Sequence, residues 1–326
     1  MRNLLFTFIL ALVSVLTSAQ TFSNVAIAEA STVCSIAQDE QGMVWLGTEG
    51  GLYSYDGYRT IPHNTAADGT VVATRIHSML VCHNIIYMGT ERGLLVYDIR
   101  SGRYEQPQGQ SPKDIRAVTL HQGRLWMGSA TGLYSCDLKT NNILPENRQL
   151  HNVYSLLSTP RGLLVGTIDG LALRSPGGSI RRIPIGNGHQ PLVNALAPDR
   201  GTNDVWIGTE GALYRYDWRT LQPVAPLMGN SIKSLALHGD NIYAGTDNGM
   251  FIYNKVSNLV SHALHDSRSA RSIANNIVWA VYNDRWGNLW AGTDQGVSEI
   301  QRRPFYTYTP LSDITHTGDG NCLHLI

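Results

Sequence analysis

Short stretches of alternating apolar and polar residues, separated by glycine-containing turns, run along most of the chain. The clearest stretch is Val33–Tyr58 (VCSIAQDEQGMVWLGTEGGLYSYDGY), which opens with the period-two alternation of a strand. Asp39–Gly42 predicts a tight turn, because Asp can bond its own backbone and Gly adopts the left-handed conformation. Met43–Gly47 and Leu52–Tyr55 predict two further strands. The stretch is therefore three short strands joined by two turns.

This unit recurs seven times at a period of about 41 residues, which is typical of four-stranded propeller blades. The anchor of each repeat is the glycine of a Gly-Thr or Gly-Ser pair: Gly47, Gly89, Gly128, Gly166, Gly208, Gly245 and Gly292. Two residues before each anchor stand Trp45, Tyr87, Trp126, Leu164, Trp206, Tyr243 and Trp290. Four residues after it stand Gly51, Gly93, Gly132, Gly170, Ala212, Gly249 and Gly296.

The repeats predict an all-β fold, a seven-bladed β-propeller with four-stranded antiparallel blades and almost no helix. The fourth strand of a blade is expected after the third, at Tyr58–Pro62, Arg103–Gln106, Ile180–Ile185 and Leu259–Leu264. Two segments are candidates for the strand that completes blade seven. Phe22–Ala26 precedes the first inner strand, and Phe305–Tyr308 follows the last repeat; the sequence leaves both open.

Each position of the repeat has a structural explanation. The large side chain before the anchor can fill the space between neighbouring blades, where aromatic residues bury most area. The hydroxyl after the anchor can tie down the following turn. Glycine four residues later supplies a positive φ. We therefore interpret the anchor glycines as structural residues of the repeat.

The N-terminus predicts export. Arg2, the apolar run Leu4–Leu16 and the small residues up to Ala19 form a secretory signal peptide over residues 1–19, cleaved after Ala19. No later apolar run is long enough to span a membrane. We assign residues 20–311 to the propeller. Residues 312–326 form a tail that reads as the opening of a further repeat, which predicts a chain that stops inside a repeat.

Composition restricts the partners and cofactors. The chain has 326 residues with 25 basic and 25 acidic side chains, so no basic excess indicates a nucleic-acid partner. Cys34, Cys82, Cys136 and Cys322 occupy non-equivalent positions of the repeats, which favours buried free thiols. Their spacing gives no metal motif, and we expect neither a metal nor another cofactor.

The sequence resembles the two-component regulator propeller repeat. The resemblance is carried by Gln38-Asp39, Gly42, Trp45–Thr48, Gly51-Leu52 and Tyr55–Gly57, and again by Asp284, Gly287 and Trp290–Thr293. It covers about residues 22 to 310. In that family such repeats form the periplasmic sensor of hybrid two-component systems in Bacteroidetes-like bacteria, and many of these sensors detect glycan fragments. The resemblance implies a periplasmic sensor, while the kinase and the other downstream parts have no counterpart in this sequence.

The predicted function is therefore ligand sensing, with an oligosaccharide as the expected ligand and further propeller and kinase parts, or a second copy of the chain, as partners. A free-standing scaffold that binds proteins is the alternative. A propeller hydrolase or lyase is the third reading, but no clustered nucleophile and base stands out, so we predict no enzymatic activity.

The ligand is expected on the face that carries the linkers between blades and the turns after Gly-Thr. Acidic residues recur in those turns and can accept sugar hydroxyls or a cation, although a short acid can also simply cap its turn. Trp218 and Trp279 are the aromatic candidates for stacking on a sugar ring. The predicted ligand-binding residues are Glu49, Glu210, Asp294 and Trp279.

Overall fold

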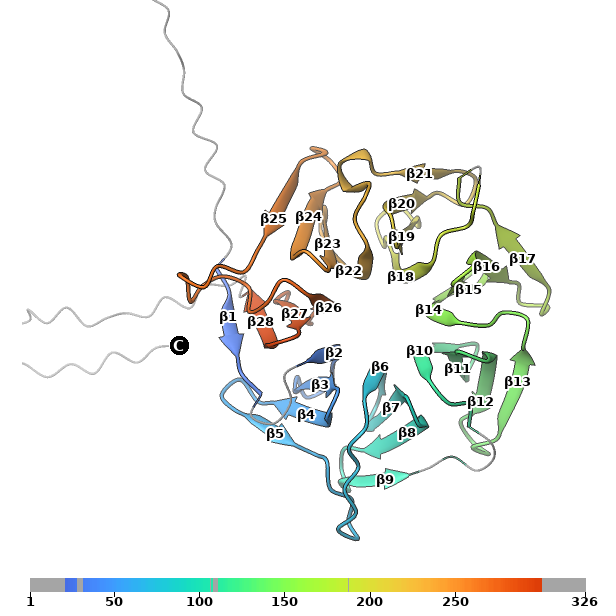
Figure 1. The fold of residues 1–326 in the computed structure, drawn as a ribbon. Helices are drawn as coiled ribbons and strands as arrows, with labels where there is room; N and C mark the ends of the chain where they lie inside the picture. The colour runs from blue at the N-terminus through green and yellow to red at the C-terminus, as the bar shows by residue number, and fades with distance from the viewer. Residues whose placement is uncertain (1–20, 28–31, 106, 108–110, 187, 301–326) are drawn as a thin grey trace, which may run out of the picture.

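Seven four-stranded antiparallel sheets form a ring of blades around a central opening (Figure 1), which confirms the predicted seven-bladed propeller. The computed structural model describes residues 21–27, 32–105, 107, 111–186 and 188–300. Within these residues the one helical segment is a short 3-10 turn, η1 (Ala225–Leu227). The signal peptide, the tail after residue 311, Phe305–Tyr308 and Cys322 lie outside the described residues.

The first three strands of each blade run from the axis outward in chain order. The innermost strands are β2 (Val33–Gln38), β6 (Ile76–Cys82), β10 (Ile115–His121), β14 (Val153–Thr159), β18 (Val193–Pro198), β22 (Ile232–His238) and β26 (Val278–Asn283). The second strands carry the anchors: β3 (Val44–Thr48), β7 (Ile85–Thr90), β11 (Arg124–Ser129), β15 (Gly162–Thr167), β19 (Val205–Thr209), β23 (Asn241–Thr246) and β27 (Leu289–Thr293). The third strands are β4 (Gly51–Tyr55), β8 (Gly93–Asp98), β12 (Gly132–Asp137), β16 (Gly170–Arg174), β20 (Leu213–Tyr216), β24 (Met250–Asn254) and β28 (Gly296–Ile300).

The outer strands are shorter. They are β5 (Thr60–Pro62), β9 (Arg103–Glu105), β13 (Ile143–Asn147), β17 (Ile180–Ile183), β21 (Leu221–Pro223), β25 (Val260–Ala263) and, for blade seven, β1 (Ser23–Val25). Four of the seven lie where the sequence predicts outer strands. β13 and β21 were not singled out by the sequence pattern.

The N-terminal segment closes the ring. Strand β1 pairs with β28 in antiparallel register, with Asn24 opposite Ser298, so the first described strand completes the last blade (Figure 1). The Ser298 hydroxyl donates to Asn24 Oδ1 at 2.7 Å, and Asn24 Nδ2 donates to the Ser272 carbonyl at 2.9 Å. This pairing settles which of the two candidate segments occupies the outer position of blade seven, and it covers a sheet edge that would otherwise be exposed.

A hydroxyl holds the turn between the second and third strand of every blade. In blade one, Thr48 Oγ1 donates to the Gly51 carbonyl at 2.9 Å and accepts from the Gly50 N–H at 3.1 Å. The other hydroxyls that donate in the same way belong to Thr90, Ser129, Thr167, Thr209, Thr246 and Thr293. The predicted role of this residue is confirmed in all seven blades.

The anchor glycines lie where one blade meets the next. A Cβ built on Gly128 would come within 2.3 Å of Val153 Cγ1, which belongs to the first residue of the next inner strand. The same contact recurs at every anchor, and at Gly292 it is made with Val33 of blade one. Because a side chain at the anchor would push the blades apart, only glycine permits this spacing.

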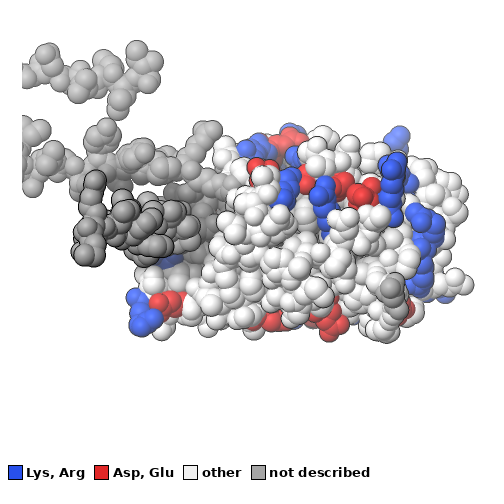
Figure 2. All heavy atoms as spheres, turned by 90° about the horizontal axis from the view of Figure 1, so that it is seen from above, with Lys and Arg blue, Asp and Glu red and all other residues white. Residues whose placement is uncertain are grey.

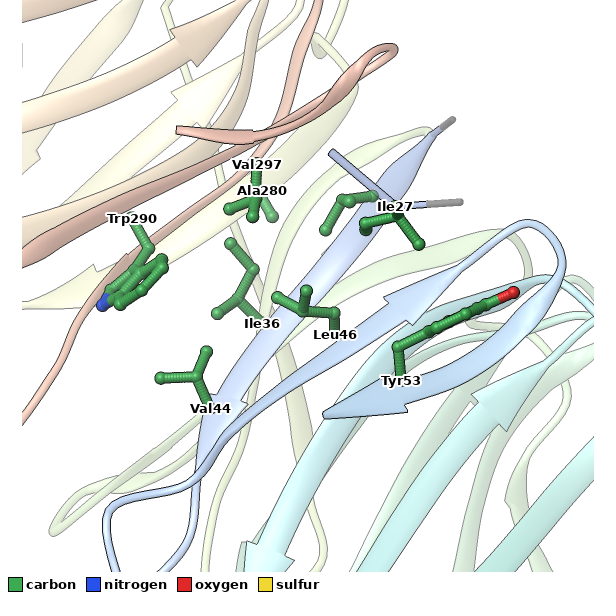
Figure 3. Close-up of a cluster of buried hydrophobic side chains, with 9 residues drawn as sticks. Ile27, Ile36, Val44, Leu46, Tyr53, Ala280, Trp290 and Val297 are labelled. Atoms are coloured by element: carbon green, nitrogen blue, oxygen red, sulfur yellow. The ribbon is translucent and has the colours of Figure 1, made fainter. Parts of the chain in front are cut away.

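The core is a set of clusters between adjacent blades. Figure 3 shows the cluster that joins blade seven to blade one, where Trp290 packs with Ile36, Val44 and Leu46. Trp45, Trp206 and Tyr243 fill the corresponding spaces against blades two, six and seven. The large residues before the anchors therefore pack between blades, as predicted.

Buried aspartates of the first hairpins hold three of these tryptophans. Trp45 Nε1 donates to Asp39 Oδ2 at 2.9 Å, and Trp290 Nε1 donates to Asp284 Oδ2 at 3.2 Å. The third pair joins Trp206 to Asp199 at 3.3 Å. The aspartates also accept from the N–H groups of their own turns, so one carboxylate fixes both the hairpin and the indole. Charged side chains otherwise lie mainly along the two edges of the ring, and much of the band between them is uncharged (Figure 2).

Candidate functional site

A cavity of about 570 Å³ opens at the axis, on the face that carries the linkers and the turns after Gly-Thr. All seven inner strands contribute one residue to it, always the second residue of the strand. These residues are Cys34, His77, Arg116, Tyr154, Asn194, Lys233 and Trp279. The cavity is thus lined by equivalent positions of the repeat that carry seven different side chains.

A β-bulge explains why these side chains reach the axis. In every blade the pairing between the first and second strands shifts after the first residue of the inner strand, as between Val33 and Ser35 or between Val278 and Ala280. The skipped residue is the one that lines the cavity. A bulge leaves one residue unpaired and re-aims its side chain. The adjacent positions on either side keep their packing between blades, because Val33, Ser35, Val278 and Ala280 are all buried.

One side of the cavity contains a charge cluster around Asp114. Arg116 donates to Asp114 Oδ2 through Nη2 at 2.6 Å and through Nε at 3.0 Å, and its guanidinium lies 4.4 Å from the Tyr154 ring centroid. His77 Nε2 is 3.3 Å from Asp114 Oδ1, which is within ion-pair distance, but the geometry is not that of a hydrogen bond. Burial lowers the pKa of His77, against the opposing effect of Asp114, and so favours the neutral imidazole.

The opposite side of the cavity is organised around Trp279. Its indole Nε1 donates to Asp294 Oδ1 at 2.5 Å. Lys233 Nζ lies 4.3 Å from the ring centroid and pairs with Asp247 Oδ1 at 2.9 Å. The Arg75 guanidinium lies 5.5 Å from the same centroid. Two cations therefore contact one indole, an arrangement in which the ring quadrupole attracts positive charge.

Cys34 and Arg75 lie side by side between these two groups. Burial raises the pKa of the Cys34 thiol, against the lowering effect of the nearby Arg75 guanidinium. Cys34 and Cys82 are half-buried and Cys136 is buried, and all three are free thiols. The expectation of free thiols is confirmed for these three, but full burial holds for Cys136 alone.

The four predicted site residues lie at this mouth. Glu210 and Trp279 line the cavity, and Asp294 holds the Trp279 indole. Glu49 is exposed, and its charge raises the pKa of Cys34. Trp218, the other aromatic candidate, is elsewhere: its Nε1 donates to the Asn203 carbonyl at 2.8 Å in the hairpin of its own blade.

The acidic residues after the anchors do not all have the same role. Asp247 pairs with Lys233, Asp294 binds the Trp279 indole, and Asp169 lies 3.7 Å from His151. The turn itself is capped by the preceding threonine or serine hydroxyl, so these carboxylates are left for side-chain contacts. Within the described ranges, no cluster of three His, Cys, Asp or Glu side chains is arranged to hold a metal ion.

The sequence did not single out Arg75, Arg116, Tyr154 or Lys233. Their common signal is a polar or aromatic residue directly before or after the first β-branched residue of each inner strand. In a simple alternating strand these positions are expected to face a neighbouring blade or the solvent. The repeated bulge directs Arg116, Tyr154 and Lys233 to one point on the axis. Arg75 reaches the same cavity from the residue before the inner strand of blade two.

A larger cavity of about 750 Å³ lies at the opposite face, against the first hairpins of blades five to seven. Its buried charge is already paired, because Lys255 Nζ contacts both oxygens of Asp199, at 2.8 and 3.0 Å. This ion pair joins blade five to blade six. We therefore take the axial cavity on the linker face as the candidate site.

The architecture is that of a seven-bladed propeller with an axial cavity, and the comparisons with known proteins show which repeat family it resembles. The family model described as "Two component regulator propeller" matches residues 29–50 and 272–295. The chain therefore carries two-component regulator propeller repeats, as the sequence predicts. The comparison with curated proteins finds no match.

Solved structures of sensor domains have the same fold. The extracellular domain of BT4673 from B. thetaiotaomicron, assigned to a one-component or hybrid two-component system, is 36% identical with a TM-score of 0.80. The match covers 87% of this chain and 40% of that one. The extracellular domain of BT3049, assigned to a hybrid two-component system of the same organism, is 21% identical with a TM-score of 0.74, over 87% and 42% of the two chains.

A streptogramin B lyase is also similar, with 10% identity and a TM-score of 0.64 over 85% of this chain and 96% of the lyase. At that identity the likeness concerns the fold alone. The present chain spans less than half of the BT4673 and BT3049 domains, and it is similar to extracellular sensor propellers. No helix in the described part of the chain is long and apolar enough to cross a membrane.

Proposed function

We propose that this chain is an exported, ligand-sensing propeller of the two-component regulator type and that an oligosaccharide binds in its axial cavity. The observation that carries the proposal is the cavity on the linker face, to which each blade contributes one bulged side chain. Concave sites of this size with a few polar groups and aromatic rings are the usual recognition surface for small ligands. The similarity to extracellular domains of two-component systems supports export and sensing.

In this proposal the propeller receives the ligand, and the signal passes to a kinase through parts other than the propeller. Tyr154 and Trp279 supply the rings, while Asn194 and Glu210 supply hydrogen-bonding groups for sugar hydroxyls. The proposed chain is a binding protein rather than an enzyme, in line with its similarity to extracellular domains of two-component systems.

Isothermal titration calorimetry with a panel of neutral and acidic oligosaccharides tests the proposal. We expect at least one saccharide to bind the wild type and to bind Tyr154→Ala and Trp279→Ala at least tenfold more weakly. Tyr58→Ala is the control, because Tyr58 is 93% exposed and lies outside the cavity. Equal binding in all three variants would contradict the axial site. A reducing-end assay on the same panel detects turnover, which would instead favour the hydrolase or lyase reading.

A protein scaffold is the competing function. It predicts that no saccharide of the panel binds, while the exported domains of a sensor co-purify with the chain. The calorimetric panel and the co-purification therefore separate the two functions.

A further inference from the structure

Three permanent cations reach the axial cavity, and two of them have carboxylate partners. Arg116 is paired with Asp114 through two nitrogens, and Lys233 is paired with Asp247 at 2.9 Å. Arg75 differs from both. Among the described residues no carboxylate lies within ion-pair distance of its guanidinium, and the aromatic ring over which it lies is that of Trp279, at 5.5 Å.

The Arg75 guanidinium has no carboxylate in direct contact among the described residues. Its Nε is buried and has no hydrogen-bond partner. The thiol beside it carries no counter-charge at neutral pH, because burial raises the pKa of Cys34. The Trp279 ring at 5.5 Å offers only its quadrupole. A buried donor without an acceptor destabilises the protein, and more so when the group is charged, so the Arg75 guanidinium favours binding of an acceptor that the chain does not supply.

The chemistry of that acceptor follows from the guanidinium. Its planar set of donors matches the two oxygens of a carboxylate or a sulfate, and such charge-assisted pairs are about twice as strong as neutral hydrogen bonds. The nearby acids do not fill the role. Asp294 is engaged by the Trp279 indole, and Glu49 and Glu91 are exposed on the turns outside the cavity. Because these acids repel other anions, an anionic ligand is expected to bind only where its charged group contacts the Arg75 guanidinium directly.

We propose that the axial cavity takes an acidic oligosaccharide whose carboxylate or sulfate ester binds the Arg75 guanidinium beside Trp279. The inference rests on the proposed function and narrows its ligand class. A uronic acid and a sulfated sugar share this oxyanion chemistry, so the experiment contains one arm for each.

The test is calorimetry with two matched pairs of ligands. The carboxylate arm compares trigalacturonate with its methyl ester, and the sulfate arm compares a 4-sulfated with an unsulfated chondroitin disaccharide whose uronate is reduced. We expect the acidic member of at least one pair to bind wild type at least tenfold more tightly than its neutral partner. That preference is expected to weaken as NaCl is raised, since salt screens the charge, and the preferred arm identifies the oxyanion.

Variants locate the anion. Arg75→Gln is expected to abolish the preference, and Arg75→Lys to retain part of it because the charge remains while the planar fork is lost. Arg200→Gln is the control, since Arg200 is exposed at the opposite face of the ring. The melting temperature of each variant shows whether the fold is intact. If an Arg75 variant melts below the assay temperature, its binding data are not used. The preference of wild type for the acidic member of each matched ligand pair, and its dependence on NaCl, then test the proposal.

The outcomes separate this inference from the proposed function. Neutral saccharides that bind as tightly as acidic ones, with no change in Arg75→Gln, overturn the role of Arg75 but leave saccharide sensing intact. Acidic ligands that bind equally to wild type and Arg75→Gln also overturn it. If neither these pairs nor the broader panel bind, both proposals fail.

Discussion

At the scale of single residues, the hydroxyl after each anchor glycine makes two kinds of hydrogen bond in its turn. It donates to a backbone carbonyl and accepts from a backbone N–H. Thr167 is an example: it is buried, donates to the Gly170 carbonyl at 3.0 Å and accepts from the Asp169 N–H at 3.1 Å. Valine has the same shape but no hydroxyl, so Thr167→Val leaves both backbone groups without their partner. We expect a loss of about 1–3 kcal/mol in the free energy of unfolding, measured by urea denaturation.

Thr167→Ser is the matched control, because Ser129 already fills the equivalent position in blade three and makes the same bond to Gly132. Serine is expected to retain most of the stability. If valine and serine were equally tolerated, the hydrogen bonds would not be what stabilises this turn.

Glycine four residues after the anchor is required by the backbone. The φ of Gly132 is +144° and that of Gly170 is +94°, and a Cβ on Gly132 would lie 2.7 Å from the Asn147 carbonyl oxygen. We expect Gly132→Val and Gly170→Val each to destabilise by about 1–3 kcal/mol from backbone strain. Ala212 occupies this place in blade five without a positive φ, so the requirement follows the local turn and not the repeat position.

Thermal melts measure this effect, with Gly211→Ala as the control. Gly211 has no atom within 4 Å of a built Cβ and no positive φ. Unchanged melting temperatures in both valine variants would contradict the strained turn.

At the scale of an element, the linker that follows β5 is fixed by a half-buried histidine, His63. His63 contacts Ser54 Oγ at 2.8 Å through Nε2 and the Tyr97 hydroxyl at 2.9 Å through Nδ1, which joins blade one to blade two. Burial lowers the pKa of His63. The unfolded chain therefore takes up a proton at His63 near pH 6.5, whereas the folded chain takes it up only at a lower pH. The stability that the neutral His63 side chain contributes above about pH 6.5 is therefore lost progressively as the pH falls below that value.

Urea denaturation at pH 8 and pH 5 checks this prediction. We expect His63→Gln to be less stable than wild type at pH 8 but to lose less stability on acidification, while the other buried histidines contribute equally to both proteins. His83→Gln is the control, because His83 is an exposed histidine paired with Glu40. A pH dependence that is the same in wild type and His63→Gln would rule out His63 as the source.

At the scale of the whole molecule, the ring depends on a strand of three residues from the other end of the chain. Deletion of residues 20–26 removes β1 and exposes the edge of β28. It also removes Phe22 from the hydrophobic cluster between blades six and seven. We expect a large drop in melting temperature and concentration-dependent association, since an unpaired edge can pair with another chain. Calorimetry and sedimentation velocity measure the two effects.

Asn24→Ala is the intermediate case, because it removes the side-chain bonds to Ser272 and Ser298 but keeps the backbone pairing. Its melting temperature is expected between those of wild type and the deletion. A deleted protein that melts like wild type and stays monomeric would show that β1 is dispensable for closure.

The sequence by itself determined the blades and their number, because every blade is built from local contacts that recur at one spacing. The anchor glycine, the hydroxyl, the turn and the large side chain all act within one repeat or against the next one, so the pattern of residues is enough to predict them. The charged and aromatic cavity was decided by the tertiary structure. Arg116, Lys233 and Trp279 are far apart in the sequence, and they meet because a bulge in each inner strand directs its second residue to the axis of the closed ring. Arg75, which directly precedes the inner strand of blade two, joins them at the same cavity. Which segment supplies the outer strand of blade seven was likewise decided by the tertiary structure, because the pairing of β1 with β28 joins two distant parts of the chain.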